Sequence, residues 1–281
     1  MTRIGLISDT HMPQRFKALP SGVFDLLNGV DCILHAGDVG ELWVLDQLSR
    51  LAPVIAVHGN DETSEATAAL PYLQTLCIAG HRVVITHAHY PDRADELASR
   101  TNDWQPHVDR RVNFAQQHGA SIIIYGHFHI PMLLERQGIL LVNPGAIASG
   151  NPWTRQTIQT IAIMSLQAGK TPDITHYDVK TLKIHKPMFD PAGFEPTFKN
   201  YNEIILESDV YEVREWLWSS LCSTHKGVLD CILALGHLRW EGHRTDKISA
   251  QELATALLAA HLPQATMQLL RDHPLFALYM T

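Results

Sequence analysis

The first half of the chain alternates short apolar runs, rich in β-branched residues, with stretches of helical periodicity. Strands separated by helices are typical of βαβ units, in which helices cover both faces of a parallel or mixed sheet. The helical stretches are Ser21–Asn28, Glu41–Leu51 and Val108–Gln117, and glycines close the first and the last of them. The expected strands are Arg3–Ser8, Cys32–His35, Val54–Val57, Thr75–Ile78, Arg82–Thr86, Ser121–Tyr125 and Ile139–Val142.

The pattern changes at about residue 165, which divides the chain into three expected parts. Residues 1–168 are expected to form an α/β domain, and residues 169–201, with several prolines and little periodicity, a connecting segment that wraps back to it. Residues 202–281 are expected to form a mainly helical extension, in which Ser249-Ala-Gln-Glu252 is a capping box. The apolar faces of these helices are expected to pack within the extension. A homo-oligomer contact and a cap over the functional site are the alternatives.

An Asp, Asn or His side chain follows each of five expected strands. In α/β sheets, ligands bind at the edge where the carboxyl ends of the strands meet, so these side chains are expected to converge. One such residue alone is usually a turn former or a helix cap, and one His-x-His pair is usually incidental. Five such events in order favour a shared site. The residues, in strand order, are Asp9 and His11, Asp38, Asn60, His87, and His127 with His129.

The chemistry of this set points to metal ions. Imidazole and carboxylate together bind borderline divalent metals. The set contains no cysteine, which disfavours a structural zinc site. Seven ligands are too many for one tetrahedral ion, and they suit two ions about 3.5–4 Å apart that share a bridging carboxylate. Mn, Fe, Ni, Co and Zn are all compatible with these ligands, and Mn is favoured.

The order of these motifs resembles the calcineurin-like metallophosphoesterase superfamily, and in particular its small bacterial and archaeal phosphodiesterases, the YfcE-like branch. Asn143-Pro144-Gly145-Ala146 is also similar to the closing motif of that branch, where Ser is more usual than Ala at the last position. The resemblance covers about residues 1–165. The motifs that carry it are Asp9-x-His11, Gly37-Asp38, Gly59-Asn60, His87 and Gly126-His127-Phe128-His129.

The resemblance implies a sandwich of two mixed β-sheets flanked by helices, and it implies a role for each ligand. Asp38 would bridge the two metals. Two cations lower the pKa of a bound water from about 15.7 to about 7, so a metal-bridging hydroxide would be available to attack a phosphodiester or phosphomonoester. A small phosphorylated substrate of nucleotide type is expected. The implied ligands of one metal are Asp9, His11 and His129, and those of the other are Asn60, His87 and His127.

One departure from the superfamily affects the leaving group. Many members have Gly-Asn-His-Glu in the third motif, and that His helps to protonate the leaving group, whereas this chain has Asp61 there. The ordinary pKa of Asp is about 3.9, so Asp61 is expected to be ionised and unable to donate a proton, which favours diesters over alkyl monoesters. His89 is an alternative acid, although a supporting or core role is more usual for such a residue.

The expected contacts with the substrate come from three residues. Asn60 and His127 belong to the ligand set. Arg93 lies between the fourth and fifth motifs, where its guanidinium could bind a substrate phosphate, although an ordinary solvated helix face is the favoured interpretation. The four residues with expected catalytic roles are Asp38, Asn60, Asp61 and His89.

Composition restricts the partners. The net charge of −7 argues against nucleic acid, which needs a basic face. No apolar stretch approaches the ~20 residues that span a bilayer, and the N-terminal run is too short for a signal peptide, so a cytoplasmic location without membrane contact is expected. Two other functions stay open: a non-catalytic protein-interaction scaffold, as in a retromer subunit of the superfamily, and a metal-dependent nuclease.

Overall fold

The computed structural model describes residues 1–99 and 103–279. The chain forms two compact units, one of residues 1–150 with 156–202 and one of residues 151–155 with 203–281. The segment 169–201, set apart in the sequence by its prolines, supplies two strands and a helix to the first unit.

A six-stranded sheet in the order β12-β11-β10-β1-β2-β3 forms one layer of the first unit. Strands β1, β2 and β3 are parallel neighbours, with Ile4 opposite Cys32 and Ile33 opposite Val54. Strand β10 lies beside β1 in antiparallel orientation and is missing from the expected strands. The strands are β1 Thr2–Ile7, β2 Cys32–His35, β3 Val54–Ala56, β10 Thr160–Leu166, β11 Asp173–Asp178 and β12 Ile184–His185.

A five-stranded sheet in the order β4-β5-β6-β8-β7 forms the second layer. Its central strands β5, β6 and β8 are parallel, with Val83 opposite Ile122 and Ile123 opposite Leu141, while the outer strands are antiparallel to their neighbours. The strands are β4 Leu73–Ile78, β5 His81–Thr86, β6 Ile122–Ile124, β7 Met132–Arg136 and β8 Ile139–Asn143.

The two sheets pack face to face across an apolar core. Ile4 and Leu6 of the first sheet belong to the same buried cluster as Ile122 and Ile124 of the second, and all four are at most 1% exposed. Each such side chain stabilises the fold by about 1.5–3 kcal/mol. The structure thus confirms the expected sandwich of two mixed sheets.

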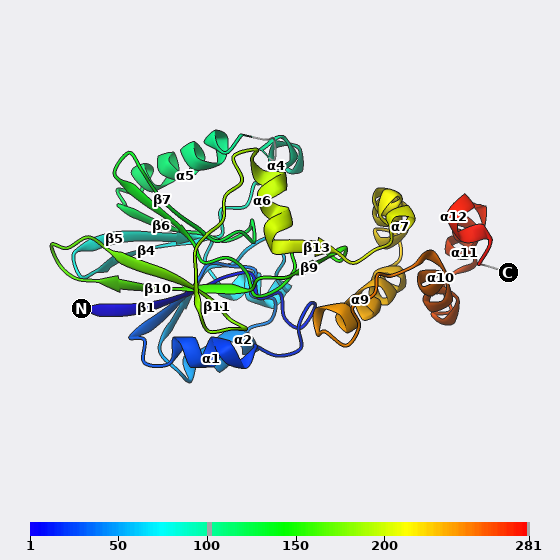
Figure 1. Ribbon diagram of the computed structural model, residues 1–281, viewed down its shortest axis with the longest axis horizontal. Helices are drawn as coiled ribbons and strands as arrows, with labels where there is room; N and C mark the ends of the chain where they lie inside the picture. The colour runs from blue at the N-terminus through cyan, green and yellow to red at the C-terminus, as the bar shows by residue number, and fades with distance from the viewer. Residues whose placement is uncertain (100–102, 280–281) are drawn as a thin grey trace. The chain divides into compact units, whose positions relative to one another are not determined.

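Helices cover the outer faces of the sandwich (Figure 1). Helices α1 and α2 bury apolar side chains on the six-stranded sheet, and α5 and α6 bury theirs on the five-stranded sheet. The short helix α3 begins after Thr63, whose side chain accepts a hydrogen bond from the backbone N–H of Ala66 at 3.2 Å. The helices are α1 Ser21–Leu27, α2 Trp43–Ser49, α3 Ser64–Ala69, α4 Arg93–Ser99, α5 Gln105–Gln117 and α6 Phe194–Tyr201.

The second unit is mainly helical. Ser249 caps α10 by accepting a hydrogen bond from the N–H of Glu252 at 3.1 Å, as the capping box predicts. The buried guanidinium of Arg239 is satisfied by Glu252 at 2.7 Å and by Asp246 at 3.3 Å. Its helices are α7 Ser208–Glu212, α8 Arg214–Trp216, the π-helical turn η1 Leu217–Cys222, α9 Lys226–Trp240, α10 Ala250–Ala259, α11 Gln264–Asp272 and α12 Pro274–Ala277.

The short strands β9 Thr154–Gln156 and β13 Asn202–Ile204 fall where the chain passes between the units in sequence. Among the described residues, no helix combines the length and the apolar character needed to cross a membrane.

Candidate metal centre

The loops after β1, β2 and β6 have unusual backbone conformations. Side-chain-bearing residues rarely adopt positive φ angles, and such strained residues cluster where function needs a particular side-chain direction. Each of these three loops contains at least one non-glycine residue with a positive φ angle. All of these residues are sequence-predicted ligands. They are Asp9 (φ 54°), His11 (φ 45°), Asp38 (φ 51°), His127 (φ 76°) and His129 (φ 58°).

Hydrogen bonds between the loops bring these residues together. The N–H of Asp9 donates to the carbonyl of Gly37 at 3.0 Å, and the N–H of His11 donates to the carbonyl of Asp38 at 3.0 Å. The N–H of His127 donates to the carboxylate of Asp9 at 3.2 Å. The loop that follows β1 is therefore tied to the loops that follow β2 and β6, one in each sheet.

One ligand group consists of Asp9, His11 and His129. Nε2 of His129 lies 3.2 Å from Oδ1 of Asp9 and 3.2 Å from Nε2 of His11. The ligand atoms of these residues all lie within 4.8 Å of one another, and the three side chains are buried. Two imidazoles and one carboxylate that converge in this way suit a borderline divalent metal.

A second ligand group consists of Asp38, His87 and His127, with the same mutual spacing of at most 4.8 Å. Nε2 of His87 lies 3.1 Å from Oδ2 of Asp38. The same Oδ2 atom lies 3.5 Å from Nε2 of His11, which belongs to the first group. The carboxylate of Asp38 therefore faces ligands of both groups, as a bridging carboxylate must.

The imidazoles are oriented for metal binding. Nδ1 of His87 lies 2.8 Å from the carbonyl of Ala36, and Nδ1 of His129 lies 2.7 Å from the carbonyl of Ala148. A carbonyl can only accept, so each Nδ1 carries a proton when the ring is neutral, and the lone pair then lies on Nε2. This arrangement is usual for histidine ligands of metals.

Two buried ring nitrogens supply an independent test of the fit. Nε2 of His87 and Nε2 of His127 make no hydrogen bond of regular geometry among the described residues, although carboxylate oxygens of Asp38 and Glu96 lie 3.1 Å and 3.5 Å away. Buried polar atoms are nearly always satisfied, and an ion that the structure does not contain is one explanation for an exception. The donor set, its burial and these two nitrogens all fit divalent metals.

Burial and opposite charges together set the protonation states of the metal-free site. Burial by itself raises the pKa of Asp9, but His129 and His87 lower it to about 2. Burial by itself lowers the pKa of His87, but Asp38 raises it to about 9. For His127 burial prevails and lowers the pKa to about 4, so this imidazole is neutral at pH 7.

The seventh predicted ligand, Asn60, is an exposed residue of the loop after β3. Both of its neighbours approach the carboxylate of Asp38. A Cβ at Gly59 would overlap Asp38, and the N–H of Asp61 donates to Oδ1 of Asp38 at 2.9 Å. Asn60 therefore lies between two residues that approach Asp38 of the second group, although no contact of its side chain with the group is seen among the described residues.

His89 lies beside the second group. Its ring centroid is 5.7 Å from that of His87 and 6.2 Å from that of His127, and Tyr72 packs edge-on against it at 5.5 Å. Burial lowers the pKa of His89 to about 4, with the neighbouring His87 and His127 adding to the effect, so it is neutral at pH 7. Arg93 begins α4, but its side chain lies outside the described residues.

Two carboxylates near the site were not found from the sequence. Glu62 accepts backbone N–H groups of Val39, Gly40 and Gly59 at 2.9, 2.7 and 3.1 Å, and so ties the loop after β2 to the loop after β3. Glu96 of α4 is 6% exposed, and its Oε1 lies 3.5 Å from Nε2 of His127. The Glu of the third motif, two residues after Asn60, was a usable signal for Glu62, whereas nothing in the pattern marks Glu96.

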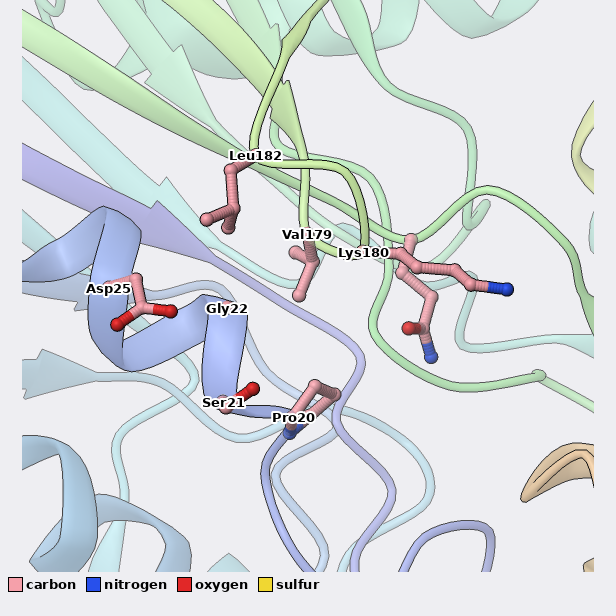
Figure 2. A pocket seen from close by; sticks show the side chains of 8 residues that line it. Pro20, Ser21, Gly22, Asp25, Val179, Lys180 and Leu182 are labelled. Atoms are coloured by element: carbon pink, nitrogen blue, oxygen red, sulfur yellow. The ribbon is translucent and has the colours of Figure 1, made fainter.

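A hollow elsewhere on the first unit contains none of the predicted ligands (Figure 2). It lies between α1 and the segment that follows β11. Charged groups in its lining come from Asp25 and Lys180. The residues that line it carry no grouping typical of a metal site, so the metal centre remains the candidate site.

The calcineurin-like phosphoesterase superfamily domain matches residues 2–169 of the chain. A probable metallophosphoesterase from Methanocaldococcus jannaschii is 37% identical over 145 residues, which are 51% of this chain and 67% of that protein. A phosphodiesterase from the same organism is 27% identical over 158 residues, a match that covers 51% of this chain and 82% of that protein.

Solved structures agree on the fold. A Vps29 variant from Entamoeba histolytica superposes with a TM-score of 0.52 and 21% identity over 66% of this chain and 96% of that one. Vacuolar protein sorting 29 from Cryptosporidium parvum gives a TM-score of 0.51 and 20% identity over 66% and 94%. With the match to residues 2–169, the sandwich fold and the two ligand groups in place, the chain belongs to the calcineurin-like phosphoesterase superfamily.

Proposed function

We propose that this protein is a dinuclear-metal-dependent phosphoesterase that hydrolyses phosphodiesters of nucleotide type. The observation that carries the proposal is the position of Asp38. Its Oδ2 lies 3.1 Å from Nε2 of His87 and 3.5 Å from Nε2 of His11, and these two imidazoles belong to different ligand groups. A carboxylate shared in this way distinguishes a two-metal site from two unrelated metal sites.

The side chains would divide the work between two ions. Divalent cations would supply Lewis acidity and a nucleophilic water at neutral pH. Asp9, His11 and His129 would hold the first ion, and His87 and His127 the second, with Asn60 completing the second and contacting substrate from its exposed position. The buried Asp9 and Asp38 carry the negative charge that holds the pair of cations. Mn is the favoured metal.

The groups around the leaving oxygen bear on which leaving groups are favoured. Burial by itself raises the pKa of Asp61, but the hydrogen bond to His11 lowers it below its ordinary value, so Asp61 is ionised at pH 7. His89 is neutral at that pH. Neither group is a strong acid for an alkoxide, so substrates with acidic leaving groups are favoured. The choice of a diester is supported by the phosphodiesterase among the relatives.

The test compares two aryl substrates. Purified protein with added Mn²⁺ should hydrolyse bis-p-nitrophenyl phosphate faster than p-nitrophenyl phosphate. Asp38→Asn should lower kcat/KM by at least about 100-fold, because it removes charge stabilisation from both ions at once. Asp46→Asn, which alters an exposed carboxylate of α2, is the matched control and should have no effect.

Metal content separates the alternatives. Elemental mass spectrometry of the digested protein should find two Mn²⁺ ions per chain in the wild type. It should find fewer in Asp38→Asn. Two bound ions with no hydrolysis of either ester would favour the non-catalytic scaffold. Hydrolysis of single-stranded DNA in preference to both esters would favour the nuclease.

A further inference from the structure

We infer that Asp61 is a positioning residue, which holds the metal ligand His11 through its side chain and the bridging ligand Asp38 through its backbone. The inference rests on the proposed function, since it concerns ligands of the same two-metal site. It gives Asp61 a role different from that of the His that many superfamily members have at this place. That His helps to protonate the leaving group, whereas Asp61 would act through two metal ligands and would not touch the substrate.

The side-chain contact orients His11. Oδ2 of Asp61 lies 3.1 Å from Nδ1 of His11. A carboxylate accepts, so Nδ1 donates its proton and the lone pair of the ring lies on Nε2. That Nε2 atom lies 3.2 Å from Nε2 of His129 and 3.9 Å from Oδ1 of Asp9, the other members of the first group. The contact therefore fixes both the tautomer and the direction of the ring.

His11 differs from the other oriented imidazoles in the kind of partner it has. His87 and His129 direct Nδ1 to backbone carbonyls, whose positions are set by the main chain. His11 directs Nδ1 to a carboxylate that comes from another loop, 50 residues away in sequence. A carboxylate partner also makes the imidazole a more basic ligand than a carbonyl partner does.

The backbone contact acts on the other ligand group. The N–H of Asp61 donates to Oδ1 of Asp38 at 2.9 Å. With Oδ1 engaged, Oδ2 is the atom that faces His87 at 3.1 Å and His11 at 3.5 Å. One residue of the loop after β3 therefore fixes a ligand of the first group and the bridge to the second.

The position of Asp61 makes the inference testable. Its side chain is 35% exposed, so truncation does not open a buried cavity, and the backbone N–H is retained in every variant. Asp61→Ala removes the acceptor for Nδ1. Asp61→Asn keeps an acceptor oxygen but removes the charge. Glu65→Ala, which removes an exposed carboxylate from the following helix, is the matched control.

The measurement is a calorimetric titration of metal-free, full-length protein with Mn²⁺. Asp61→Ala should weaken one of two Mn²⁺ binding events by about 10–100-fold, the usual effect of removing such a partner, and change the other by less than about threefold. Asp61→Asn should recover at least half of the lost affinity, measured as the logarithm of the dissociation constant. Glu65→Ala should bind as the wild type does. With Co²⁺ in place of Mn²⁺, the absorption spectrum of Asp61→Ala should change for the weakened site alone.

Three results would overturn the inference. The first is that Asp61→Ala keeps both wild-type affinities and loses rate only on esters with basic leaving groups, which would make Asp61 an acid. The second is that both affinities fall equally, together with the stability of the metal-free protein, which would make its role purely structural. Wild-type protein that binds fewer than two ions would remove both proposals. Two bound ions without ester hydrolysis would refute the proposed function alone, because this titration does not depend on turnover.

Discussion

Replacing Gly59 with alanine would place a methyl group against the carboxylate that joins the two ligand groups. A Cβ atom at this position would lie 2.6 Å from the backbone nitrogen of Asp38 and 2.8 Å from its Cγ, and it would come closer still to Oδ1. Real Cβ atoms essentially never approach other atoms within 3.0 Å. The nearest atoms include main chain, so the loop after β2 or the loop after β3 has to move.

The size of this movement sets the expected effect. Ordinary contact between heavy atoms lies at about 3.5–4 Å, so the Gly59→Ala loop must shift by about 1 Å relative to Asp38. Overpacking of this kind costs about 1–3 kcal/mol of unfolding free energy. A displacement of about 1 Å in a catalytic group can lower the rate about 100-fold. We expect both effects, together with weaker Mn²⁺ binding.

The assays are urea unfolding of the metal-free protein, Mn²⁺ titration, and hydrolysis of bis-p-nitrophenyl phosphate. Gly80→Ala is the control, because a Cβ there meets nothing within 4 Å although φ is 83°. It should lower the unfolding free energy by about 1 kcal/mol, from backbone strain alone, and leave the other two measurements unchanged. Gly59→Ala with wild-type affinity and activity would refute the steric reasoning, whatever its stability.

Three further predictions concern protons and the supporting loops. In metal-free protein His87 has a pKa of about 9, because burial, which lowers it, is outweighed by Asp38. The imidazole must lose this proton to bind metal, so Mn²⁺ affinity should rise as pH increases from 6.5 to 9, and a pH-independent affinity would contradict this. Glu62→Gln leaves one of three backbone N–H groups without its acceptor, and should lower the unfolding free energy by about 1–3 kcal/mol in urea. Burial lowers the pKa of His176 to about 4, below the ordinary 6.5, so stability should fall as pH drops from 6.5 to 4. This loss is about 3 kcal/mol, and His176→Gln, which keeps a donor for the carbonyl of Asn143, should reduce the slope in urea unfolding at pH 7 and 5.

The sandwich could be predicted from the sequence as far as local patterns determine it. The runs that form β1, β2 and β6 are short, apolar and followed by ligand motifs. Both their strand character and their direction could therefore be predicted from the sequence. Strand β10 is just as apolar, but no motif follows it. Its antiparallel pairing with β1, Thr2 opposite Leu166, joins residues that are far apart in the sequence, and periodicity carries no information on such a partner.

The candidate site divides in a similar way. The residues that the structure brings together as two groups are those that follow strands, because the sheet itself directs them to one edge. The supporting contacts depend on where side chains from distant loops end. Glu96 reaches His127 from a helix, and Asp61 reaches His11 from the loop after β3. A motif records which residue stands at each place, but it does not show which nitrogen of His11 faces which neighbour.

Opposite charges hold the ligand cluster in place before any ion binds. Asp9 and Asp38 are both buried, and an unpaired buried carboxylate would cost about several kcal/mol. The pKa of Asp9 is lowered to about 2 and that of His87 is raised to about 9, and both shifts express the attraction between carboxylates and imidazoles in one enclosure. Cations that bind there neutralise the same carboxylates and displace a proton. Protons and metal ions therefore stabilise the same arrangement, so the loops with left-handed backbone can keep their geometry in both states.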